Sequence, residues 1–590
     1  MSKNNLQDTW DLTHIYNDVS ELKADVKKLL ELLNEFLKLK GKLNNKETLI
    51  KEVLLGEQTG LLESKIYSYL SLRSALNIKD DEIQHLSTEI YIETDKINKQ
   101  LNFVVPEILA NDEKLLLEVA NDERIRPRRK SYLKFIESKK HWLSEREEYI
   151  FDRLLSGSSI SSIYDLHQNE LTFEKALDSN NVYHEVTHTN LSKLFESPDR
   201  TLRKNTFKSV YKTYSKHIYT IGEMYLSYTK TRKEINELRK YNSVLEAVVI
   251  ADESTEKVYN TLITTVNENL NVVDNIIKLL KKVTNLQDFN RYDFGYNPYK
   301  AIDQKYTYIE AQEIVKKALS VLGEEYISKL DKAFNSRWID VYPKENKDKG
   351  AFNLGVYNIH PYVLLNFEGT FDDVSTIAHE LGHAMHSCLA MDNQKLCNSG
   401  CTIMVAEVAS TVNEILLTEY LLNNETDIEK KKYILLEQIL TIHGTLLRQT
   451  MFAEFEKQVA DKMQNDEVLT TKILNEIYLD LTKKYFRAII ELDTDIKYEW
   501  ARIPHFYSTF YVYKYATGIS SAIAIAQNIL KKGKPYIDKY FDMLKSGTSV
   551  DSISTLKIAE VDLEDKNTYI SAIEFLNNRI EQLNDLIDNH

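Results

Sequence analysis

Hydrophobic positions along this chain of 590 residues recur mainly at the spacing of an amphipathic α-helix. Long stretches such as 81–103 place apolar residues on one helical face and polar residues on the other, which is typical of helices that pack around a core. Ser197 and Pro198 precede another long stretch, and we expect a helix capped by Ser197, with Pro198 at its first position, to run to about Arg239. The pattern therefore predicts a mostly α protein.

Two short stretches break the helical pattern. Residues 170–189 mix β-branched side chains with Asn and Asp, which favours a short β or irregular segment. Residues 350–369 read G-A-F-N-L-G-V-Y-N-I-H-P-Y-V-L-L-N-F-E-G and carry the clearest strand signal, and Pro361 within them predicts an edge strand. Such an edge can pair with an extended peptide. We therefore expect a small β-sheet within the helical fold.

The stretch 372–389 reads D-D-V-S-T-I-A-H-E-L-G-H-A-M-H-S-C-L and has two distinct helical faces. At 100° per residue, its apolar side chains lie between about 140° and 240° from His379. His383, His386 and Ser375 lie within about 40° of His379. We expect a buried helix beside the sheet, with its imidazoles facing a cleft.

His379 and His383 stand four residues apart in the motif H-E-L-G-H, so both can bind one metal ion from the same side of a helix. Glu380 lies next to them, where its carboxylate can act on a water molecule held by that ion. This spacing is typical of zinc hydrolases.

The same motif occurs a second time, as H-E-V-T-H at residues 184–188. Its neighbours favour a short strand over a helix. In a strand, His184 and His188 would lie about 13 Å apart and could not share one ion. The copy at 379–383 is therefore the predicted metal motif.

A catalytic zinc ion needs a third protein ligand and one open position. Within residues 403–422, Ser410, Thr411 and Glu414 lie within about 60° of Glu407 on one helical face, opposite an apolar face. We expect this helix to be buried, and a buried carboxylate needs a partner. Glu407 is the predicted third ligand, with Glu414 as hydrogen-bond acceptor for a ligand imidazole. The alternative for Glu407 is an ion pair with a core arginine.

Composition and charge narrow the function. Gly (16) and Pro (8) are scarce, which favours long helices. The net charge of −14 argues against a nucleic-acid partner, and the basic run at 124–130 is interpreted as a solvated helix start. No apolar run is long enough to span a membrane. Three Cys predict no disulfide framework, and no signal peptide is seen at the N-terminus, so we expect a cytoplasmic protein.

Three segments carry a family resemblance. They read T-I-A-H-E-L-G-H-A-M-H at 376–386, A-E-V-A-S-T-V-N-E at 406–414 and W-A-R-I-P-H-F-Y-S-T-F-Y-V-Y-K-Y-A-T-G at 500–518. They resemble the two metal-site segments and the substrate-binding segment of the thimet-oligopeptidase-like zinc metallopeptidases, and among these the oligoendopeptidase F subfamily. W-D-L-T-H-I-Y at 10–16 is similar to the family's N-terminal opening, and the resemblance covers about residues 200–585.

The resemblance implies a fold and a cofactor. The fold would be a large two-lobed helical body with a deep central channel, divided into an N-terminal helical region (1–195) and a catalytic region (196–590). The cofactor would be one zinc ion per chain, held by His379, His383 and Glu407. Short peptides would be the substrates, with no nucleic-acid or membrane partner.

The segment 500–518 also contains groups that can stabilise a transition state. His505, Tyr507, Tyr511 and Tyr513 are packed into nine residues and can donate hydrogen bonds to an oxyanion. The resemblance implies that a His and one or two Tyr in this segment do so. The alternative for each Tyr is a packing role in the core.

The predicted function is zinc-dependent hydrolysis of internal peptide bonds in short, unstructured oligopeptides. Zinc would lower the pKa of its water and polarise the scissile carbonyl, and Glu380 would move the proton from the water to the leaving amine. Two alternatives stay open: a zinc carboxypeptidase of similar helical fold, and a non-catalytic peptide-binding helical protein.

Overall fold

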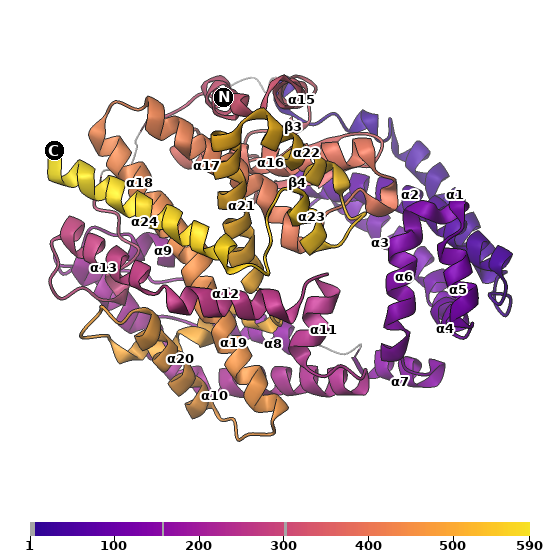
Figure 1. The fold of residues 1–590 in the computed structure, drawn as a ribbon, viewed down its shortest axis with the longest axis horizontal. Helices are drawn as coiled ribbons and strands as arrows, with labels where there is room; N and C mark the ends of the chain where they lie inside the picture. The colour runs from indigo at the N-terminus through magenta and orange to yellow at the C-terminus, as the bar shows by residue number, and fades with distance from the viewer. Residues whose placement is uncertain (1–5, 156–158, 300–303, 590) are drawn as a thin grey trace. The chain divides into compact units, whose positions relative to one another are not determined.

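Most of the described chain is α-helical, as the sequence predicts. The computed structural model describes residues 6–155, 159–299 and 304–589, and Figure 1 shows their helices and strands. Contacts divide the chain into two compact units, each assembled from three separate segments. Unit 1 comprises Met1–Phe151, Asp303–Leu417 and Ile525–Glu560; unit 2 comprises Asp152–Ile302, Thr418–Ala524 and Val561–His590.

The helices of unit 1 come from all three of its segments. They are α1 (Val19–Leu37), α2 (Lys46–Leu76), α3 (Asp81–Asn98), α4 (Val104–Leu109), α5 (Glu113–Ala120), α6 (Arg129–Ser138), α14 (Tyr308–Leu319), α15 (Glu324–Asn335), α16 (Phe371–Asn393), α22 (Lys534–Ser546) and α23 (Ser552–Ile558). Helices α7 (Glu145–Leu155), α17 (Ile403–Asn424) and α21 (Tyr513–Lys532) each include a point where the division between the units falls. The predicted division at residue 195 into a helical and a catalytic region stays a prediction.

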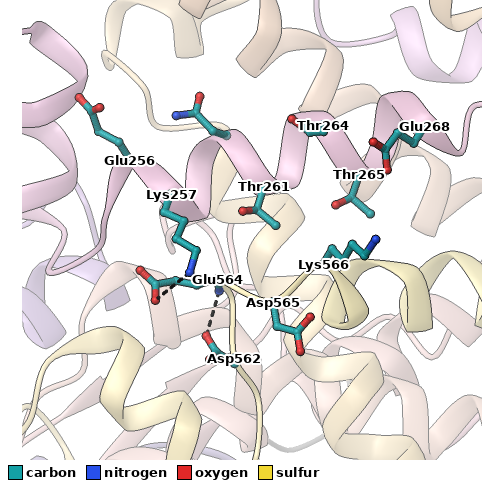
Figure 2. A pocket seen from close by; sticks show the side chains of 11 residues that line it. Glu256, Lys257, Thr261, Thr264, Thr265, Glu268, Asp562, Glu564, Asp565 and Lys566 are labelled. Atoms are coloured by element: carbon teal, nitrogen blue, oxygen red, sulfur yellow. Dashed lines mark hydrogen bonds and ion pairs between the residues drawn. The ribbon is translucent and has the colours of Figure 1, made fainter.

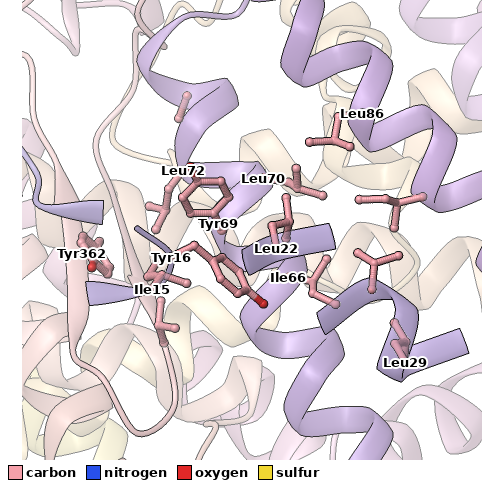
Figure 3. Close-up of a cluster of buried hydrophobic side chains, with 14 of the residues drawn as sticks. Ile15, Tyr16, Leu22, Leu29, Ile66, Tyr69, Leu70, Leu72, Leu86 and Tyr362 are labelled. Carbon is pink, nitrogen blue, oxygen red and sulfur yellow. The ribbon is translucent and has the colours of Figure 1, made fainter. Parts of the chain in front are cut away.

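A hydrophobic core joins the first segment of unit 1 to its second. Apolar side chains of α1, α2 and α3 pack with Ile15 and Tyr16 and with Tyr362 from the sheet, as Figure 3 shows. Trp10 extends this core, and its indole Nε1–H donates to the carbonyl of Val363 at 2.8 Å. The N-terminal residues are therefore part of the body that carries the sheet.

The sheet of unit 1 has three short strands in the order β3-β5-β4: β3 (Ile339–Asp340), β5 (Pro361–Leu364) and β4 (Phe352–Gly355). Strand β5 pairs parallel with β3 and antiparallel with β4, so the predicted edge position of the Pro361 strand is wrong. Pro361 is tolerated because it is the first residue of β5, where its missing N–H removes no interior ladder bond. The predicted strand region is a hairpin, and β4 forms the edge.

Helix α16 packs against β4 and β5, which confirms a small sheet beside the helix of the H-E-L-G-H motif. A capping box fixes its start: the Thr370 hydroxyl accepts from the Asp373 N–H, and the Asp373 carboxylate accepts from the Thr370 N–H. Gly369 precedes it at φ +81°, where a Cβ would lie 2.6 Å from the carbonyl oxygen of Tyr306. Only glycine fits this approach.

Unit 2 is built from helices and a short hairpin whose two strands have two residues each. Its elements are α8 (Ile160–Glu170), β1 (Ala176–Leu177), β2 (Tyr183–His184), α9 (Leu191–Phe195), α10 (Arg200–Leu238), α11 (Val244–Ala251), α12 (Glu256–Glu268), α13 (Asn271–Thr284), α18 (Ile428–Ile442), α19 (Gln449–Gln464), α20 (Thr471–Tyr485) and α24 (Lys566–Asn589). The pairing of β1 with β2 confirms the predicted β segment near residues 170–189.

The start of α10 differs from the sequence prediction. Asp199, not Ser197, is the N-cap, and its carboxylate accepts from the N–H groups of Thr201 and Leu202. A charged oxygen at this position satisfies two of the unpaired donors of the first turn, which a hydroxyl at Ser197 is too far back to reach. The helix ends at Leu238, close to the predicted end.

Candidate metal centre

The predicted metal ligands come from two helices that cross at very close range. A Cβ added to Gly382 of α16 would lie 2.5 Å from the Cα of Ser410 in α17 and 2.7 Å from the carbonyl oxygen of Ala409. The crossing is therefore possible only with glycine on one side and small residues on the other. Asn413, fully buried, ties the same helices together, because its Nδ2–H donates to the carbonyl of Ala378 at 2.9 Å.

Three potential ligand atoms meet where the helices cross. The Nε2 atoms of His379 and His383 lie 3.2 Å apart, and each lies 3.5 Å from Oε2 of Glu407. In the described part of the chain, these residues form the one group of three His, Cys, Asp or Glu side chains able to hold a metal ion. A tetrahedral zinc ion with N and O ligands at about 2.0–2.2 Å requires ligand atoms about 3.3–3.5 Å apart. The three residues fit such an ion.

Glu414 hydrogen-bonds one of the predicted ligands and orients its ring. Its carboxylate Oε1 accepts a hydrogen bond from Nδ1–H of His379, as predicted for this face of α17. This contact fixes the proton on Nδ1 and leaves the Nε2 lone pair of His379 facing the other two ligand atoms. Burial lowers the pKa of His379, but the hydrogen bond and charge of Glu414 outweigh it and raise that pKa overall.

Glu380 lies beside the ligand pair and is buried, with 5% of its surface exposed. Its Oε2 has no hydrogen-bond partner among the described residues, and burial raises its pKa above the usual value. Glu380 also lines a hollow of about 350 Å³ with His379, Glu414, Ser375 and Thr376. A carboxylate that lines this hollow and keeps one oxygen without a partner in the described chain is suited to accept a proton from a bound molecule.

Glu407 is less buried than the sequence predicts. Its side chain is 49% exposed, so the expectation of a buried carboxylate on α17 is wrong. The residue lies in the second turn of α17 and stays half-exposed, although Val405, Val408 and, on its own face, Ser410 are buried. Hydrogen bonding to His383 lowers the pKa of Glu407, so the carboxylate is ionised at neutral pH.

Among the described residues, the second copy of the motif is not part of a group able to hold a metal ion. His184 lies on strand β2, and its Nε2 lies 2.9 Å from a carboxylate oxygen of Asp178. Nε2 of His188 instead contacts the carbonyl oxygen of Gln168 at 3.0 Å. The two imidazoles therefore have different partners. Strand β2 ends at His184, so the predicted strand over 184–188 is wrong beyond its first residue.

The segment 500–518 lies in unit 2, where His505 belongs to the short helix η11 (Pro504–Tyr507). The ring of Tyr511 stacks near His505 at a centroid distance of 6.2 Å, and the hydroxyl of Tyr515 lies 3.3 Å from His505 Nε2. Burial, with a smaller contribution from the charge of Arg448, lowers the pKa of His505. The imidazole is therefore neutral at neutral pH.

The other two predicted tyrosines of this segment point into the core. Tyr507 stacks on Tyr164 at 4.3 Å, and its hydroxyl is buried without a partner in the described chain. The hydroxyl of Tyr513 donates to Asp252 at 2.9 Å, and its side chain is fully buried. Of the predicted tyrosines, the structure therefore brings only Tyr511 to His505.

Sequence reasoning did not single out Tyr515, Gly382 or Asn413 for these roles. Tyr511 and Tyr515 are four residues apart, and this spacing places two side chains on one side of a helical turn. That spacing could have indicated Tyr515. Nothing in the local sequence shows which residues of another helix Gly382 and Asn413 approach.

A larger hollow of about 900 Å³ lies on unit 2 between α12 and the start of α24, as Figure 2 shows. Its lining is polar, and its charges partly pair with each other, as Lys257 does with Glu564 at 3.9 Å. It contains none of the predicted site residues. We assign no chemistry to it.

The fold and the His-His-Glu group together define a class: a mostly helical protein that presents H-E-x-x-H on one helix and a glutamate from the next helix has the build of a metallopeptidase. The chain belongs to peptidase family M3, whose family model matches residues 193–575. Both helices of the metal centre fall within the matched region.

Relatives match nearly the whole chain. Oligopeptidase PepF of Bacillus subtilis (strain 168) is 35% identical, over 98% of this chain and 87% of the relative. A solved structure from Chlamydophila abortus is 30% identical with a TM-score of 0.92, over 99% of both chains. The crystal structure of oligoendopeptidase-F from Enterococcus faecium is 27% identical with a TM-score of 0.74, over 97% of this chain and 99% of that one. None of the described helices is both long and apolar enough to cross a membrane.

Proposed function

We propose that this chain is a zinc-dependent endopeptidase that hydrolyses internal bonds of short, unstructured oligopeptides. The observation that carries the proposal is the meeting of His379, His383 and Glu407, with ligand atoms 3.2–3.5 Å apart. Two imidazoles and one carboxylate are a donor set that suits zinc and leaves one position open. One ion per chain would be held.

The ion and the protein would divide the chemistry. Bound zinc would polarise the scissile carbonyl and lower the pKa of a water molecule. Glu380 accepts the proton of the attacking water and then donates it to the leaving amine. Its burial supports this role, because a raised pKa brings a carboxylate closer to the pKa suited to proton transfer at neutral pH.

We further propose that His505 and a neighbouring tyrosine donate hydrogen bonds to the oxyanion. Tyr511 and Tyr515 are favoured over Tyr507 and Tyr513, because the first two lie against His505 while the other two are packed in the core. A neutral imidazole keeps one N–H for donation without introducing a charge of its own.

The names of the relatives support peptides as substrates and internal bonds as the point of cleavage. A carboxypeptidase of similar fold remains the alternative, and the products distinguish the two. Zinc content should be about one equivalent per chain, and cleavage of a mixed peptide pool should stop when a chelator removes the metal and return when zinc is added.

Mass spectrometry of the products gives the decisive result. Fragments from internal cleavage of peptides, with a folded protein left intact in the same tube, are expected. Stepwise removal of single C-terminal residues would replace the proposal by a carboxypeptidase. Peptide binding without any chelator-sensitive cleavage would replace it by a binding protein.

A further inference from the structure

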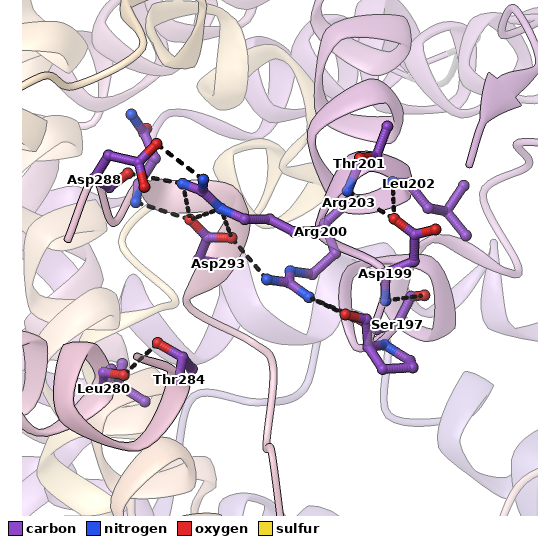
Figure 4. Close-up of polar contacts among 12 residues, drawn as sticks. Ser197, Asp199, Arg200, Thr201, Leu202, Arg203, Leu280, Thr284, Asp288 and Asp293 are labelled. Carbon is purple, nitrogen blue, oxygen red and sulfur yellow. Dashed lines mark hydrogen bonds and ion pairs between the residues drawn. The ribbon is translucent and has the colours of Figure 1, made fainter. Parts of the chain in front are cut away.

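Two ion clusters in unit 2, each built around a buried carboxylate, differ in their charge balance. In the first, shown in Figure 4, Arg200 and Arg203 face Asp288 and Asp293. Arg200 uses Nε, Nη1 and Nη2 in hydrogen bonds, and Arg203 Nη2 pairs with Asp293 at 2.8 Å. Two cations meet two anions, so the cluster needs nothing from outside.

The second cluster gathers three guanidinium groups around one carboxylate. Glu499, of the helix η10 (Thr494–Arg502), accepts from Nη2 of Arg448 at 2.8 Å and from Nη2 of Arg502 at 3.2 Å. Its second oxygen accepts from the hydroxyl of Tyr478 at 2.6 Å. Glu499 is 3% exposed, and although burial acts to raise its pKa, the charges of Arg448, Arg291 and Arg502 hold that pKa well below the usual value.

The third cation, Arg291, contributes charge, and its guanidinium makes no hydrogen bond to the described residues. The group lies over the rings of Phe486 at 4.2 Å and Phe294 at 5.2 Å, and its Nε is buried without a partner in the described chain. Nε of Arg448 is likewise buried and unpartnered there. Glu499 neutralises only one of the three guanidinium charges, so the cluster has an excess of two positive charges. Such an excess is costly inside a protein unless an anion compensates it.

Solvent can reach the cations of this second cluster. The side chains of Arg448 and Arg502 are 24% and 28% exposed, although Glu499 beneath them is buried. Each hydrogen-bonds Glu499 through one nitrogen, and in the described chain their other guanidinium nitrogens have no hydrogen-bond partner. Two partly free guanidinium forks at one place suit an anion that accepts two parallel hydrogen bonds.

We infer that Arg448 and Arg502 bind a carboxylate of the peptide substrate beside His505. The inference rests on the proposed peptidase function, because it takes the ligand to be a peptide. In an unmodified peptide the only anionic groups at neutral pH are carboxylates, which belong either to the C-terminus or to Asp and Glu side chains. Arg502 is three residues before His505, so a carboxylate bound there places the chain of the peptide at the segment to which the oxyanion donors belong.

The test uses matched peptides and the full-length enzyme. One internally quenched peptide is made with a free C-terminus and with a C-terminal amide. A second series carries one Glu, or Gln in its place, at each position in turn. Loss of the recognised carboxylate should lower kcat/KM by roughly 10- to 100-fold, mainly through KM. The amide and the Glu-to-Gln series show which source supplies the carboxylate.

Variants connect this preference to the cluster. In Arg448→Met the ratio of kcat/KM between the acid and neutral peptides should fall to about 1, and in Arg448→Lys it should be intermediate, because a lysine keeps the charge but not the fork. Arg200→Met is the matched control, since the Arg200 side chain is 28% exposed, close to the 24% of Arg448, but belongs to the balanced cluster. It should keep the ratio of the parent enzyme.

Two results would overturn the inference: equal kcat/KM for acid and neutral peptides in the parent enzyme, or an unchanged ratio in both Arg448 variants. Calorimetry of the same peptides with the Glu380→Gln protein measures binding without cleavage. It therefore distinguishes failure of this inference from failure of the proposed function. If no variant cleaves peptides, the acid-to-neutral ratio of Kd still decides the inference. If cleavage is normal and both ratios are near 1, only the inference fails.

Discussion

Individual residues in this protein owe their chemistry to burial and to one or two close partners. Glu380 and Glu407 are carboxylates near the same imidazoles, yet burial raises the pKa of Glu380 while hydrogen bonding lowers the pKa of Glu407. A carboxylate that stays ionised suits a cation, and one with a raised pKa suits proton transfer. The two glutamates are thereby separated into ligand and base.

Glu380→Gln should lower kcat by roughly 10²–10⁴-fold while zinc content stays at the parent value, because the amide fills the same space but cannot accept the proton. Peptide turnover and metal analysis of the same sample measure this. The second H-E-x-x-H copy provides the control: Glu185→Gln, at an exposed position paired with Lys175, should leave both quantities unchanged. Normal turnover in Glu380→Gln would assign the base elsewhere.

His360 predicts a loss of stability in acid. Its Nδ1–H donates to the carbonyl of Pro361 at 2.8 Å, so Nε2 is the acceptor for Nδ1–H of His14 at 2.9 Å, and the ring stacks on Trp338. Burial, above all, lowers its pKa to about 4. In the unfolded chain this histidine has its usual pKa of about 6.5, so the unfolded state binds a proton before the folded state does as the pH falls.

The contribution of His360 to the free energy of unfolding is therefore intact above about pH 6.5. It is lost progressively as the pH falls to about 4, by roughly 3 kcal/mol. Denaturant unfolding at a series of pH values measures the loss. His360→Gln cannot take up charge, so its stability should change less over the same interval. An equally steep acid loss in this variant would attribute the effect to other groups.

At the scale of elements, close crossings and anchored turns position the side chains. Helices α16 and α17 approach so closely at Gly382 that the ligands of one helix reach the glutamate of the other. In unit 2, the turn after His505 contains Phe510 at φ +51°, an unusual conformation for a bulky residue. The Phe510 N–H donates to the buried Glu456 of α19 at 2.8 Å, which holds the turn in place.

Gly382→Ala should destabilise the protein by about 1–3 kcal/mol and weaken zinc binding, because the new methyl group must push the backbone of α17, and Glu407 with it, away from α16. Competition with a chromophoric chelator measures the affinity. Gly400→Ala is the matched control in the same unit, since no atom lies within 4 Å of its added Cβ. Equal zinc affinities in the two variants would contradict the role of the crossing.

Glu456→Leu should loosen the turn that follows His505, because the Phe510 N–H would be left unpaired at a cost of about 1–3 kcal/mol. Amide exchange of residues 508–512 should accelerate, and kcat/KM should fall by about tenfold or more. Burial raises the pKa of Glu456 well above the usual value, and a Gln side chain keeps an oxygen that can accept from the Phe510 N–H, so Glu456→Gln should behave like the parent. A Gln variant as impaired as the Leu variant would show that the turn needs a charge.

For the whole molecule, each compact unit gathers three distant stretches of chain. Unit 1 contains the metal centre, and its core joins residues near the N-terminus to the sheet beside α16. Trp10 is the clearest link, through packing and through its hydrogen bond to Val363. The stability of the metal centre therefore depends on residues more than 350 positions away in the sequence.

Trp10→Ala should lower the stability of unit 1 by about 3–5 kcal/mol, the usual cost of removing a large buried aromatic side chain. Thermal unfolding followed by zinc release measures it. Leu6→Ala, at a position in the same segment that is 69% exposed, should leave the unfolding temperature nearly unchanged. A Trp10→Ala protein that releases zinc at the parent temperature would contradict the coupling.

The sequence by itself determined what depends on local periodicity. The mostly helical class, the ligand face of α16 and the face shared by Glu407 and Glu414 all follow from 100° per residue, because a helix repeats the same geometry wherever it forms. The short β segment near residues 170–189 follows in the same way from composition and strand periodicity. These features do not depend on which other segment packs against the helix or strand.

Only the tertiary structure decided what depends on contacts between distant segments. The order of β3, β5 and β4, the half-exposed state of Glu407 and the partners of Tyr507 and Tyr513 are set by long-range packing. The excess charge around Glu499 likewise arises from residues at 291, 448 and 502, which no local pattern connects. Local spacing specifies which side of an element a residue occupies, whereas burial and pairing are properties of the surfaces that meet it.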